Sequence, residues 1–546
     1  MGVKDGLADW PEDVAKRYRD LGFWNGMTLG RYLWQSAERF GDKEALTDGD
    51  VRISYRELAV LSDGLAERLS ERGFGREDCI VVQLPNCWEF VVLLFACARI
   101  GVVPIMALPG HRSLELSFFV EHAGAKAIAV PDEIRGFDHQ AMAWEVAKKS
   151  STLEDVFVVG ENIGDGSVDL RGLITSSSDP QALRGRLDLI GPHSNEVALF
   201  LLSGGTTGLP KLIPRSHDDY GYNFRRSAEV CGFNPNTVYL VALPASHNFP
   251  LACPGLLGAF YSGGRVVLAR SPEPEQCMNL IAKERVTVAA AVPAVAQRWM
   301  DAKQENLSYD LSSLELIQVG GARMAPELAR KVRPVLGCAL QQVFGMAEGL
   351  INYTELGADE VVACETQGRP MSPADEVLIV DDSDVPVPEG EMGQLLTRGP
   401  YTLRGYYRAP EHNARSFTED GWYRTGDVVR WHPSGNLVVE GRTKDLINRA
   451  GEKISAEEVE NLIYRLPSVA QVAAIALPDD RFGERTCAVV VLRDGFYNLT
   501  LEEIRDAMKD FGVAKYKYPD QLVTVESLPV TNVGKIDKAL LRKQLG

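Results

Sequence analysis

The chain has 546 residues, which is too long for one hydrophobic core and predicts about three domains or subdomains. Hydrophobic residues make up 45% and charged residues 24% of the chain, so a packed globular protein is expected. The net charge of −17 makes the chain as a whole a poor partner for nucleic acid.

The cysteines and the apolar runs help to predict the cell compartment in which the protein is found. Nine cysteines are scattered without a C-x-x-C pair, which favours reduced thiols in the cytoplasm over a disulfide framework or a zinc site. The first residues contain no apolar signal segment. The longest apolar run ends before Arg99 and is too short to span a bilayer. A cytoplasmic protein without a membrane segment is therefore predicted.

The first two thirds of the chain alternate between helical and strand-like segments. Residues 54–73 and 88–101 have the character of helices. Short apolar runs predict strands at 79–85, 102–108, 126–130, 196–202, 265–270, 286–292 and 314–321. Because such strands lie between helices, we expect parallel sheets covered by helices. Residues 176–186, "SSSDPQALRGR", are expected to form a surface loop.

The last hundred or so residues differ in pattern and predict a compact α+β unit with its own core. Helices are expected at 456–466 and 501–512, and strands at 469–477, 486–494 and 520–528. The preceding segment, 436–454, is polar and basic with two glycines, which makes it the candidate hinge. An ordinary turn between a strand and a helix is the alternative reading of this segment.

Five segments can carry chemistry, in this order along the chain. "LFLLSGGTTGLPKLIPRSH" (199–217) ends a hydrophobic run in a Gly- and Thr-rich turn, a plausible cradle for phosphate oxygens. It is not a P-loop, because Leu209 and Pro210 separate Gly208 from Lys211. The next four are "QQVFGMAEG" (341–349), "GWYRTGDVV" (421–429), "EGRTKDLINRAGEKI" (440–454) and "PVTNVGKIDK" (529–538).

This ordered set resembles the adenylate-forming superfamily, which includes acyl-CoA synthetases, adenylation domains of nonribosomal peptide synthetases and luciferases. The resemblance covers nearly the whole chain. It implies a multidomain α/β and α+β fold with a large N-terminal domain, 1–443, of two sheet-and-helix subdomains plus a small β-barrel. A small mobile C-terminal domain, 444–546, would act as a lid. The implied reaction is attack of a carboxylate on the α-phosphorus of ATP, with release of pyrophosphate.

The resemblance also implies roles for individual residues. The catalytic residues would be Lys535, Glu348 and His247, with Glu348 holding Mg²⁺ and Lys444 serving as the hinge. ATP would be bound by Ser203, Gly204, Gly205, Thr206, Thr207, Lys211, Gly320, Gly321, Ala322, Val343, Phe344, Gly345, Met346, Ala347, Asp427 and Arg442. The carboxylic acid would be bound by Asn248, Phe249, Cys253, Gly320, Val343, Ile351 and Lys535.

The segment "LPASHNFPLACPGLLG" (243–258) bears on which acid is used. Taken alone it favours a capped helix start, with Asn248 as the cap, Phe249 in the core and Cys253 as a small buried residue. Together with "PKLIPRSHDDY" and "LQQVFGMAEGLINYT", however, it resembles the stand-alone aryl acid–AMP ligases of siderophore pathways. Those enzymes activate 2,3-dihydroxybenzoate or salicylate and pass the acyl group to an aryl carrier protein.

In that subfamily the position of Asn248 contacts the 2-hydroxyl of the acid and the position of Cys253 faces carbon 3. Dihydroxybenzoate enzymes typically carry serine at the latter position. A thiol is a weak hydrogen-bonding group, so Cys253 favours hydrogen at carbon 3 and hence salicylate. Ile351 departs from the leucine expected in salicylate enzymes, so a methylsalicylate stays open. An aryl-CoA ligase that uses coenzyme A and a non-catalytic carrier-binding subunit are the competing interpretations.

Overall fold

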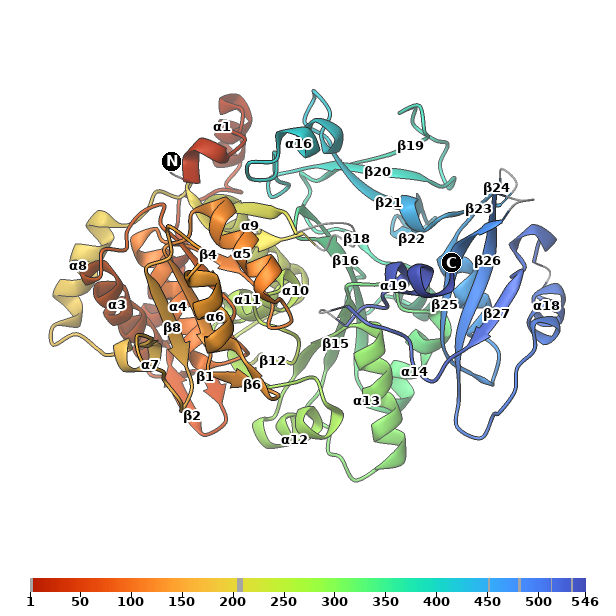
Figure 1. Cartoon of the computed structure of the whole chain (residues 1–546), viewed down its shortest axis with the longest axis horizontal. Coiled ribbons are helices and arrows are strands. Elements are labelled where there is room, and N and C mark those ends of the chain that lie inside the picture. Colours follow the sequence, from red (N-terminus) through yellow and green to blue (C-terminus); the bar gives the residue numbers. More distant parts are fainter. Residues whose placement is uncertain (1–2, 204–209, 450–451, 480–482, 512, 532–533) are drawn as a thin grey trace.

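The computed structural model describes residues 3–203, 210–449, 452–479, 483–511, 513–531 and 534–546. Figure 1 shows two large helix-covered sheets in the N-terminal body, a small antiparallel sheet above them, and a separate C-terminal unit beside that body. This arrangement agrees with the predicted architecture of a large domain followed by a small one.

The first large sheet has nine strands among the described residues, and its central strands are parallel. In spatial order these are β18 (Arg369–Pro370), β17 (Gly349–Tyr353), β16 (Ala339–Met346), β15 (Leu316–Gly320), β14 (Val288–Ala291), β12 (Val238–Val241), β13 (Arg265–Leu268), β1 (Glu44–Asp48) and β2 (Val51–Ser54). The predicted strands at 265–270, 286–292 and 314–321 are confirmed here. Buried Val, Ile, Leu and Ala fill these strands, as expected for a sheet covered on both faces.

The second large sheet has seven strands among the described residues, and only its edge pair β10–β11 is antiparallel. Its strands are β11 (Leu212–Ser216), β10 (Val197–Leu202), β4 (Val103–Met106), β3 (Cys79–Val82), β5 (Ala127–Pro131), β8 (Asp155–Val159) and β9 (Val168–Asp169). A short hairpin, β6 (Glu133–Ile134) and β7 (Phe137–Asp138), projects from it. The predicted strands at 79–85, 102–108, 126–130 and 196–202 all belong to this sheet.

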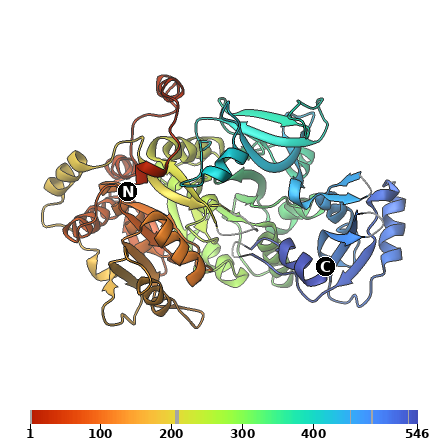
Figure 2. The same cartoon turned by 45° about the horizontal axis from the view of Figure 1, so that its top comes forward.

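Helices cover both large sheets (Figure 1, Figure 2). Those of the N-terminal body are η1 (Val3–Gly6), α1 (Glu12–Asp20), α2 (Leu29–Phe40), α3 (Tyr55–Glu71), α4 (Trp88–Ile100), α5 (Ser113–Ala123), α6 (His139–Ala147), α7 (Leu170–Leu173), α8 (Pro180–Ile190), α9 (His217–Val230), α10 (Asn248–Ala252), α11 (Gly255–Ser262), α12 (Pro274–Glu284), α13 (Pro293–Glu305), α14 (Pro326–Leu336), α15 (Glu360–Glu365) and α16 (Pro410–Ser416). The helices predicted at 54–73 and 88–101 are α3 and α4. The buried α4 joins the main hydrophobic core.

The prediction of a loop at 176–186 is wrong, because α8 begins inside that segment. Asp179 caps the helix by accepting a hydrogen bond from the Ala182 N–H at 3.0 Å, and Pro180 occupies the first turn. Leu183 and Leu187 lie one turn apart and are buried. The Ser- and Pro-rich composition that suggested a loop is the start signal of an amphipathic helix.

The expected small barrel corresponds to a four-stranded antiparallel sheet in the order β19 (Glu376–Val380), β20 (Gly393–Arg398), β21 (Tyr423–Trp431) and β22 (Leu437–Arg442). Its apolar face forms a small core of its own. Phe344 and Met346, from the end of β16, pack against that core. The small sheet is thereby anchored to the carboxyl edge of the nine-stranded sheet.

The C-terminal unit contains β23 (Ile447–Arg449), β24 (Glu452–Ile454), β25 (Val469–Asp479), β26 (Gly483–Leu492) and β27 (Gln521–Thr524), with α17 (Ala456–Ile463), α18 (Leu501–Asp510), η3 (Lys515–Lys517) and α19 (Lys538–Leu545). Two hydrophobic clusters within this unit give it an internal core, as predicted. The short helix η2 (Thr443–Asp445) precedes it. The domain boundary between residues 443 and 444 stays a prediction.

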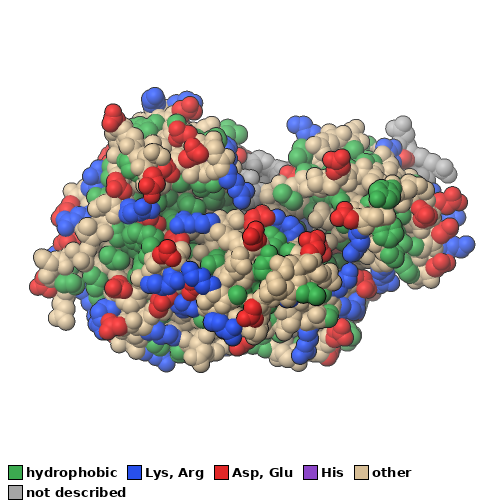
Figure 3. Space-filling model, turned by 90° about the horizontal axis from the view of Figure 1, so that it is seen from below, with side chains coloured by type: hydrophobic (Ala, Val, Ile, Leu, Met, Phe, Trp, Pro, Cys, Tyr) green, Lys and Arg blue, Asp and Glu red, His purple; other side chains and the backbone are tan. Residues whose placement is uncertain are grey.

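Two features of the structure relate to what the composition predicted about charge and membrane segments. Figure 3 shows acidic and basic side chains interspersed on one face, rather than a large patch of one sign. Within the described ranges, no helix is both long and apolar enough to cross a bilayer.

Candidate active site at the carboxyl edge of the sheets

The predicted phosphate loop connects β10 to β11. Its base is closed by two hydrogen bonds: Ser203 N–H donates to the Lys211 carbonyl at 3.0 Å, and Lys211 N–H donates to Ser203 Oγ at 2.9 Å. The Lys211 ammonium lies 5.6 Å from the centre of the Tyr406 ring. Gly204, Gly205, Thr206 and Thr207 lie outside the described residues, so their predicted roles stay predictions.

The strand ends of β15 and β16 lie side by side. The two strands are parallel, and Gly320 is paired in register with Val343. Gly321 adopts φ +83°, which favours glycine, and Ala322 follows it at an exposed position. Phe344, Gly345, Met346 and Ala347 continue β16 towards Glu348. The predicted nucleotide residues on these strands therefore share one edge, where open α/β sheets bind their ligands.

Glu348 occupies the turn between β16 and β17 and is 8% exposed. Tyr406 Oη donates a hydrogen bond to Glu348 Oε1 at 2.8 Å, and Tyr423 Oη lies 2.9 Å from Tyr406 Oη. Burial raises the pKa of the Glu348 carboxyl, and the Tyr406 hydrogen bond opposes that rise. The sequence interpretation missed Tyr406, because no local motif links it to a carboxylate 58 residues earlier.

Asp427 and Arg442 are brought together by the pairing of β21 with β22. Arg442 Nε donates to Asp427 Oδ1 at 3.0 Å. The carboxylate is buried, whereas the Arg442 side chain is 45% exposed. The strand pairing thus brings the two residues together, and their predicted roles in binding ATP stay predictions.

The short helix α10 carries the residues predicted to bind the acid. His247, rather than Asn248, is its cap, since His247 Nδ1 accepts from the Phe249 N–H at 3.2 Å. Asn248 points into the core instead, where its amide contacts Tyr220 and Cys253. Burial, with a further contribution from the Lys535 charge, lowers the pKa of His247 to about 3. His247 is therefore a neutral imidazole at physiological pH.

Asn248, Phe249 and Cys253 are all buried. Phe249 lies against the end of β15: a Cβ added to Gly320 would be 3.2 Å from two carbons of its ring. Ile351, on β17, closely approaches Gly345, and its N–H donates to Tyr401 Oη at 3.0 Å. The structure thus places Phe249 against Gly320 at the end of β15, with Val343 and Ile351 on the neighbouring strands β16 and β17.

Lys535 reaches this edge from the C-terminal unit. A Cβ added to Gly321 would lie 3.3 Å from Lys535 Cε and 4.0 Å from Nζ. The lysine is held in a turn in which its N–H donates to Thr531 Oγ1 at 3.2 Å and its carbonyl accepts from the Thr531 N–H at 2.7 Å. Lys535, which was predicted from a motif near the end of the sequence, therefore lies beside Gly321, one of the predicted nucleotide-binding residues.

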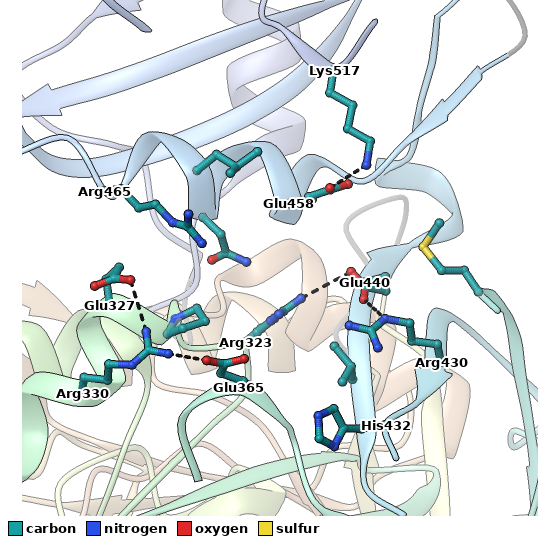
Figure 4. Close-up of a pocket in the computed structure, with 15 residues that line it drawn as sticks. Arg323, Glu327, Arg330, Glu365, Arg430, His432, Glu440, Glu458, Arg465 and Lys517 are labelled. Carbon is teal, nitrogen blue, oxygen red and sulfur yellow. Dashed lines mark hydrogen bonds and ion pairs between the residues drawn. The ribbon is translucent and has the colours of Figure 1, made fainter. Parts of the chain in front are cut away.

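A hollow lies between the two domains, away from these residues. It has a volume of about 1020 Å³ and is lined mainly by charged side chains of α14, β21, β22, α17 and η3 (Figure 4). None of the predicted nucleotide or acid residues is among its described lining residues. Strand topology and the position of Lys535 therefore favour the sheet edge as the active site over this cavity.

Comparison with known proteins identifies the family. The chain matches the family of AMP-binding enzymes over residues 33–407 and the C-terminal domain of AMP-binding enzymes over residues 458–535. The chain belongs to the AMP-binding enzyme family. The predicted membership in the adenylate-forming superfamily and the predicted fold are confirmed, and use of ATP follows from membership in the family.

Individual AMP-binding enzymes show which kinds of family member this chain is similar to. A "salicylyl-CoA synthase / salicylate adenylyltransferase" from a Streptomyces species is 60% identical, covering 99% of this chain and 98% of that protein. A "2,3-dihydroxybenzoate-AMP ligase" from Bacillus subtilis is 48% identical, covering 99% and 98%. The apo structure of MbtA from Mycobacterium smegmatis is 44% identical with a TM-score of 0.76, covering 100% and 99%. The predicted resemblance to aryl acid–AMP ligases is therefore confirmed.

Proposed function

We propose that the protein activates a 2-hydroxybenzoic acid, salicylate in the first place, and transfers it to a thiol. In the first step a carboxylate oxygen attacks the α-phosphorus of ATP, the bond from that phosphorus to the bridging oxygen breaks, and pyrophosphate leaves. In the second step a thiol sulfur attacks the acyl carbon, the thiol loses its proton and AMP leaves. The observation that carries the proposal is the buried Asn248–Cys253 pair, 3.3 Å apart, at the sheet edge where Lys535 docks.

The chain's own residues supply positioning and charge, which phosphoryl transfer requires more than a base. Lys535 would lie between the carboxylate and the α-phosphate, and Lys211 would face the departing phosphates. Asp427 would accept hydrogen bonds from the ribose hydroxyls, and the strand ends at Gly320–Gly321 and Phe344 would flank adenine. Gly320, Gly321 and Phe344 belong to the ends of the neighbouring strands β15 and β16, and Lys535 lies beside Gly321, which supports a single nucleotide site.

The donor chemistry of Glu348 fits Mg²⁺, which prefers carboxylate and phosphate oxygens. The described residues contain no cluster of three or more His, Cys, Asp or Glu side chains that could hold a metal ion. Glu348 would therefore hold the ion together with oxygens of ATP, and Tyr406 orients the Glu348 carboxylate. When bound, the ion would neutralise charge on the leaving pyrophosphate.

Salicylate is favoured over 2,3-dihydroxybenzoate by the chemistry around carbon 3. Burial raises the pKa of the Cys253 thiol to about 12, so this side chain stays protonated and offers only weak hydrogen bonds. A buried 3-hydroxyl facing it would lose most of a hydrogen bond, at a cost of about 1–3 kcal/mol. The name of the 60% identical relative supports the same acid. 2,3-Dihydroxybenzoate and a methylsalicylate remain the alternatives.

The experiment is pyrophosphate release with salicylate, methylsalicylates, 2,3-dihydroxybenzoate and benzoate. We expect salicylate to have the highest kcat/KM. A preference for 2,3-dihydroxybenzoate or a methylsalicylate would replace the proposed substrate within the same reaction.

The proposed thiol acceptor is a phosphopantetheinylated aryl carrier protein or coenzyme A. The printed name of the 60% identical relative includes both a CoA synthase and an adenylyltransferase. Adding each thiol in turn to the enzyme with bound aryl-AMP, and measuring the rate of transfer, distinguishes the two acceptors.

Replacing Cys253 by serine tests the discrimination at carbon 3. Cys253→Ser keeps the size of the side chain and supplies a strong hydrogen-bonding group, so kcat/KM for 2,3-dihydroxybenzoate relative to salicylate should rise about ten-fold. Both acids are measured on both proteins. Cys277→Ser, the same change at a buried cysteine of α12, is the control and should leave the ratio unchanged. An unchanged ratio in Cys253→Ser would mean that this residue does not face carbon 3.

Replacing Asp427 by asparagine tests the ribose assignment. The carboxylate would make charge-assisted hydrogen bonds worth about 1.5–3 kcal/mol, so Asp427→Asn should raise KM for ATP roughly ten-fold or more. KM for the aryl acid should change little. The same substitution at the exposed Asp494 is the control. Equal increases in both KM values would point to a general loss of structure instead.

A further inference from the structure

Three buried side chains form a chain of hydrogen bonds at the proposed acid pocket. Tyr220, on α9, donates from its hydroxyl to Asn248 Oδ1 at 2.9 Å. Asn248 Nδ2 in turn donates to Cys253 Sγ at 3.3 Å. The amide oxygen is thus occupied by a donor, and one of the two amide N–H groups is occupied by the thiol. Asn248 Nδ2 keeps its second N–H group for a ligand, whereas Oδ1, although it has a second lone pair, is directed towards the Tyr220 hydroxyl.

Tyr220 is itself held rigidly. Its side chain is fully buried, and the Arg215 guanidinium lies 4.9 Å from the centre of its ring. Arg215 is fixed by an ion pair with Asp219 at 2.7 Å and by donation to the Ala347 carbonyl at 2.8 Å. Burial raises the pKa of the Tyr220 hydroxyl well above its usual value, so this group stays protonated and remains a donor. Arg215 and Tyr220 lie in "PRSHDDY", but the sequence alone did not assign them a role.

We propose that Tyr220 is a positioning residue that orients the Asn248 amide with an N–H group towards the acid and thereby selects a hydrogen-bond acceptor at the carbon ortho to the carboxylate. The inference rests on the proposed function, because it needs Asn248 to face the ortho substituent. Without the Tyr220 hydroxyl, the amide could rotate by 180° and present its oxygen instead. The pocket would then accept a donor group at that carbon.

This orientation fits an ortho-hydroxyl group and opposes an ortho-amino group. In salicylate the hydroxyl donates its hydrogen to the neighbouring carboxylate, so its oxygen is left as an acceptor. In 2-aminobenzoate the nitrogen lone pair is delocalised into the ring, so the amine offers N–H donors and is a poor acceptor. Two donors facing each other leave a buried N–H group unpaired, which is costly. The wild type should therefore use salicylate far better than 2-aminobenzoate.

The test is kcat/KM for pyrophosphate release with salicylate, 2-aminobenzoate and benzoate. We expect the salicylate to 2-aminobenzoate ratio to fall about ten-fold in Tyr220→Phe, a change equivalent to one hydrogen bond. Tyr222→Phe is the matched control: it lies on the same helix and loses one hydrogen bond, to Ser372 at 2.6 Å, that does not involve Asn248. Its ratio should match that of the wild type.

A double-mutant cycle separates positioning from general damage. If Tyr220 acts through Asn248, Tyr220→Phe should not change the ratio further in an Asn248→Ala background. An unchanged ratio in Tyr220→Phe, or an equal change in both backgrounds, would overturn the inference. If Tyr220→Phe fails to fold, the wild type alone still tests the inference. Equal kcat/KM for 2-aminobenzoate and salicylate in the wild type would contradict the proposed orientation of the Asn248 amide. Absence of activity with every 2-hydroxybenzoate would instead remove the proposed function, and this inference with it.

Discussion

Replacing Lys535 by alanine should lower the rate of adenylation about 10²–10³-fold and largely spare transfer from preformed aryl-AMP. The structure places this lysine next to Gly321, at the edge that carries the proposed nucleotide residues. Charge develops on the phosphoryl group during the first step, and losing one preorganised stabiliser of such charge typically costs about this much. The second step develops its charge on the oxygen of the acyl group and needs room for a thiol instead.

The two half-reactions are measured separately. Adenylation is followed by pyrophosphate release, and transfer is followed by mixing purified salicyl-AMP with the enzyme and its thiol acceptor. Lys543→Ala, on the exposed side of α19, is the matched control and should keep both rates. Equal losses in the two half-reactions of Lys535→Ala would remove the lysine from its proposed place.

Replacing Lys444 by proline should slow one half-reaction far more than the other, and the structure indicates that transfer is the slower one. Residue 444 lies in η2, a turn of 3₁₀ helix, and the φ typical of 3₁₀ helices, about −50° to −70°, includes the −65° that proline imposes. Proline would therefore favour the present arrangement, with Lys535 at the sheet edge, over a rotated one. Lys444→Ala keeps the freedom of the backbone and should leave both rates near wild type.

The ion pairs that line the cavity between the domains do not oppose such a rotation. Ion pairs at the 1020 Å³ cavity join residues of the same domain: Arg330 with Glu327 and Glu365, Arg430 with Glu440, and Lys517 with Glu458 (Figure 4). Separating the two sides breaks none of these pairs. If Lys444→Pro kept wild-type rates in both half-reactions, the hinge would lie elsewhere.

The parallel strands were predictable because each is a short apolar run whose residues are buried on both faces. Asp427 and Arg442 were also predictable as site residues, since both belong to recognisable segments of the sequence. The strands β21 and β22 bring these segments into register. The helix α8 was missed because its start signal, Asp179–Pro180, looks like a loop until Leu183 and Leu187 are seen to pack inward. Tyr220 and Tyr406 were out of reach for a different reason. Their partners Asn248 and Glu348 lie 28 and 58 residues away in sequence, and only the folded chain shows the contacts.

The central claim is that this protein joins a 2-hydroxybenzoic acid to AMP at the site where Lys535 meets the sheet edge. The most direct test is to incubate the wild type with ATP, Mg²⁺ and salicylate without any thiol, and to detect the products by mass spectrometry. We expect salicyl-AMP and pyrophosphate in equal amounts, with little of either from Lys535→Ala. Failure to form an aryl-AMP from salicylate, a methylsalicylate or 2,3-dihydroxybenzoate would contradict the account.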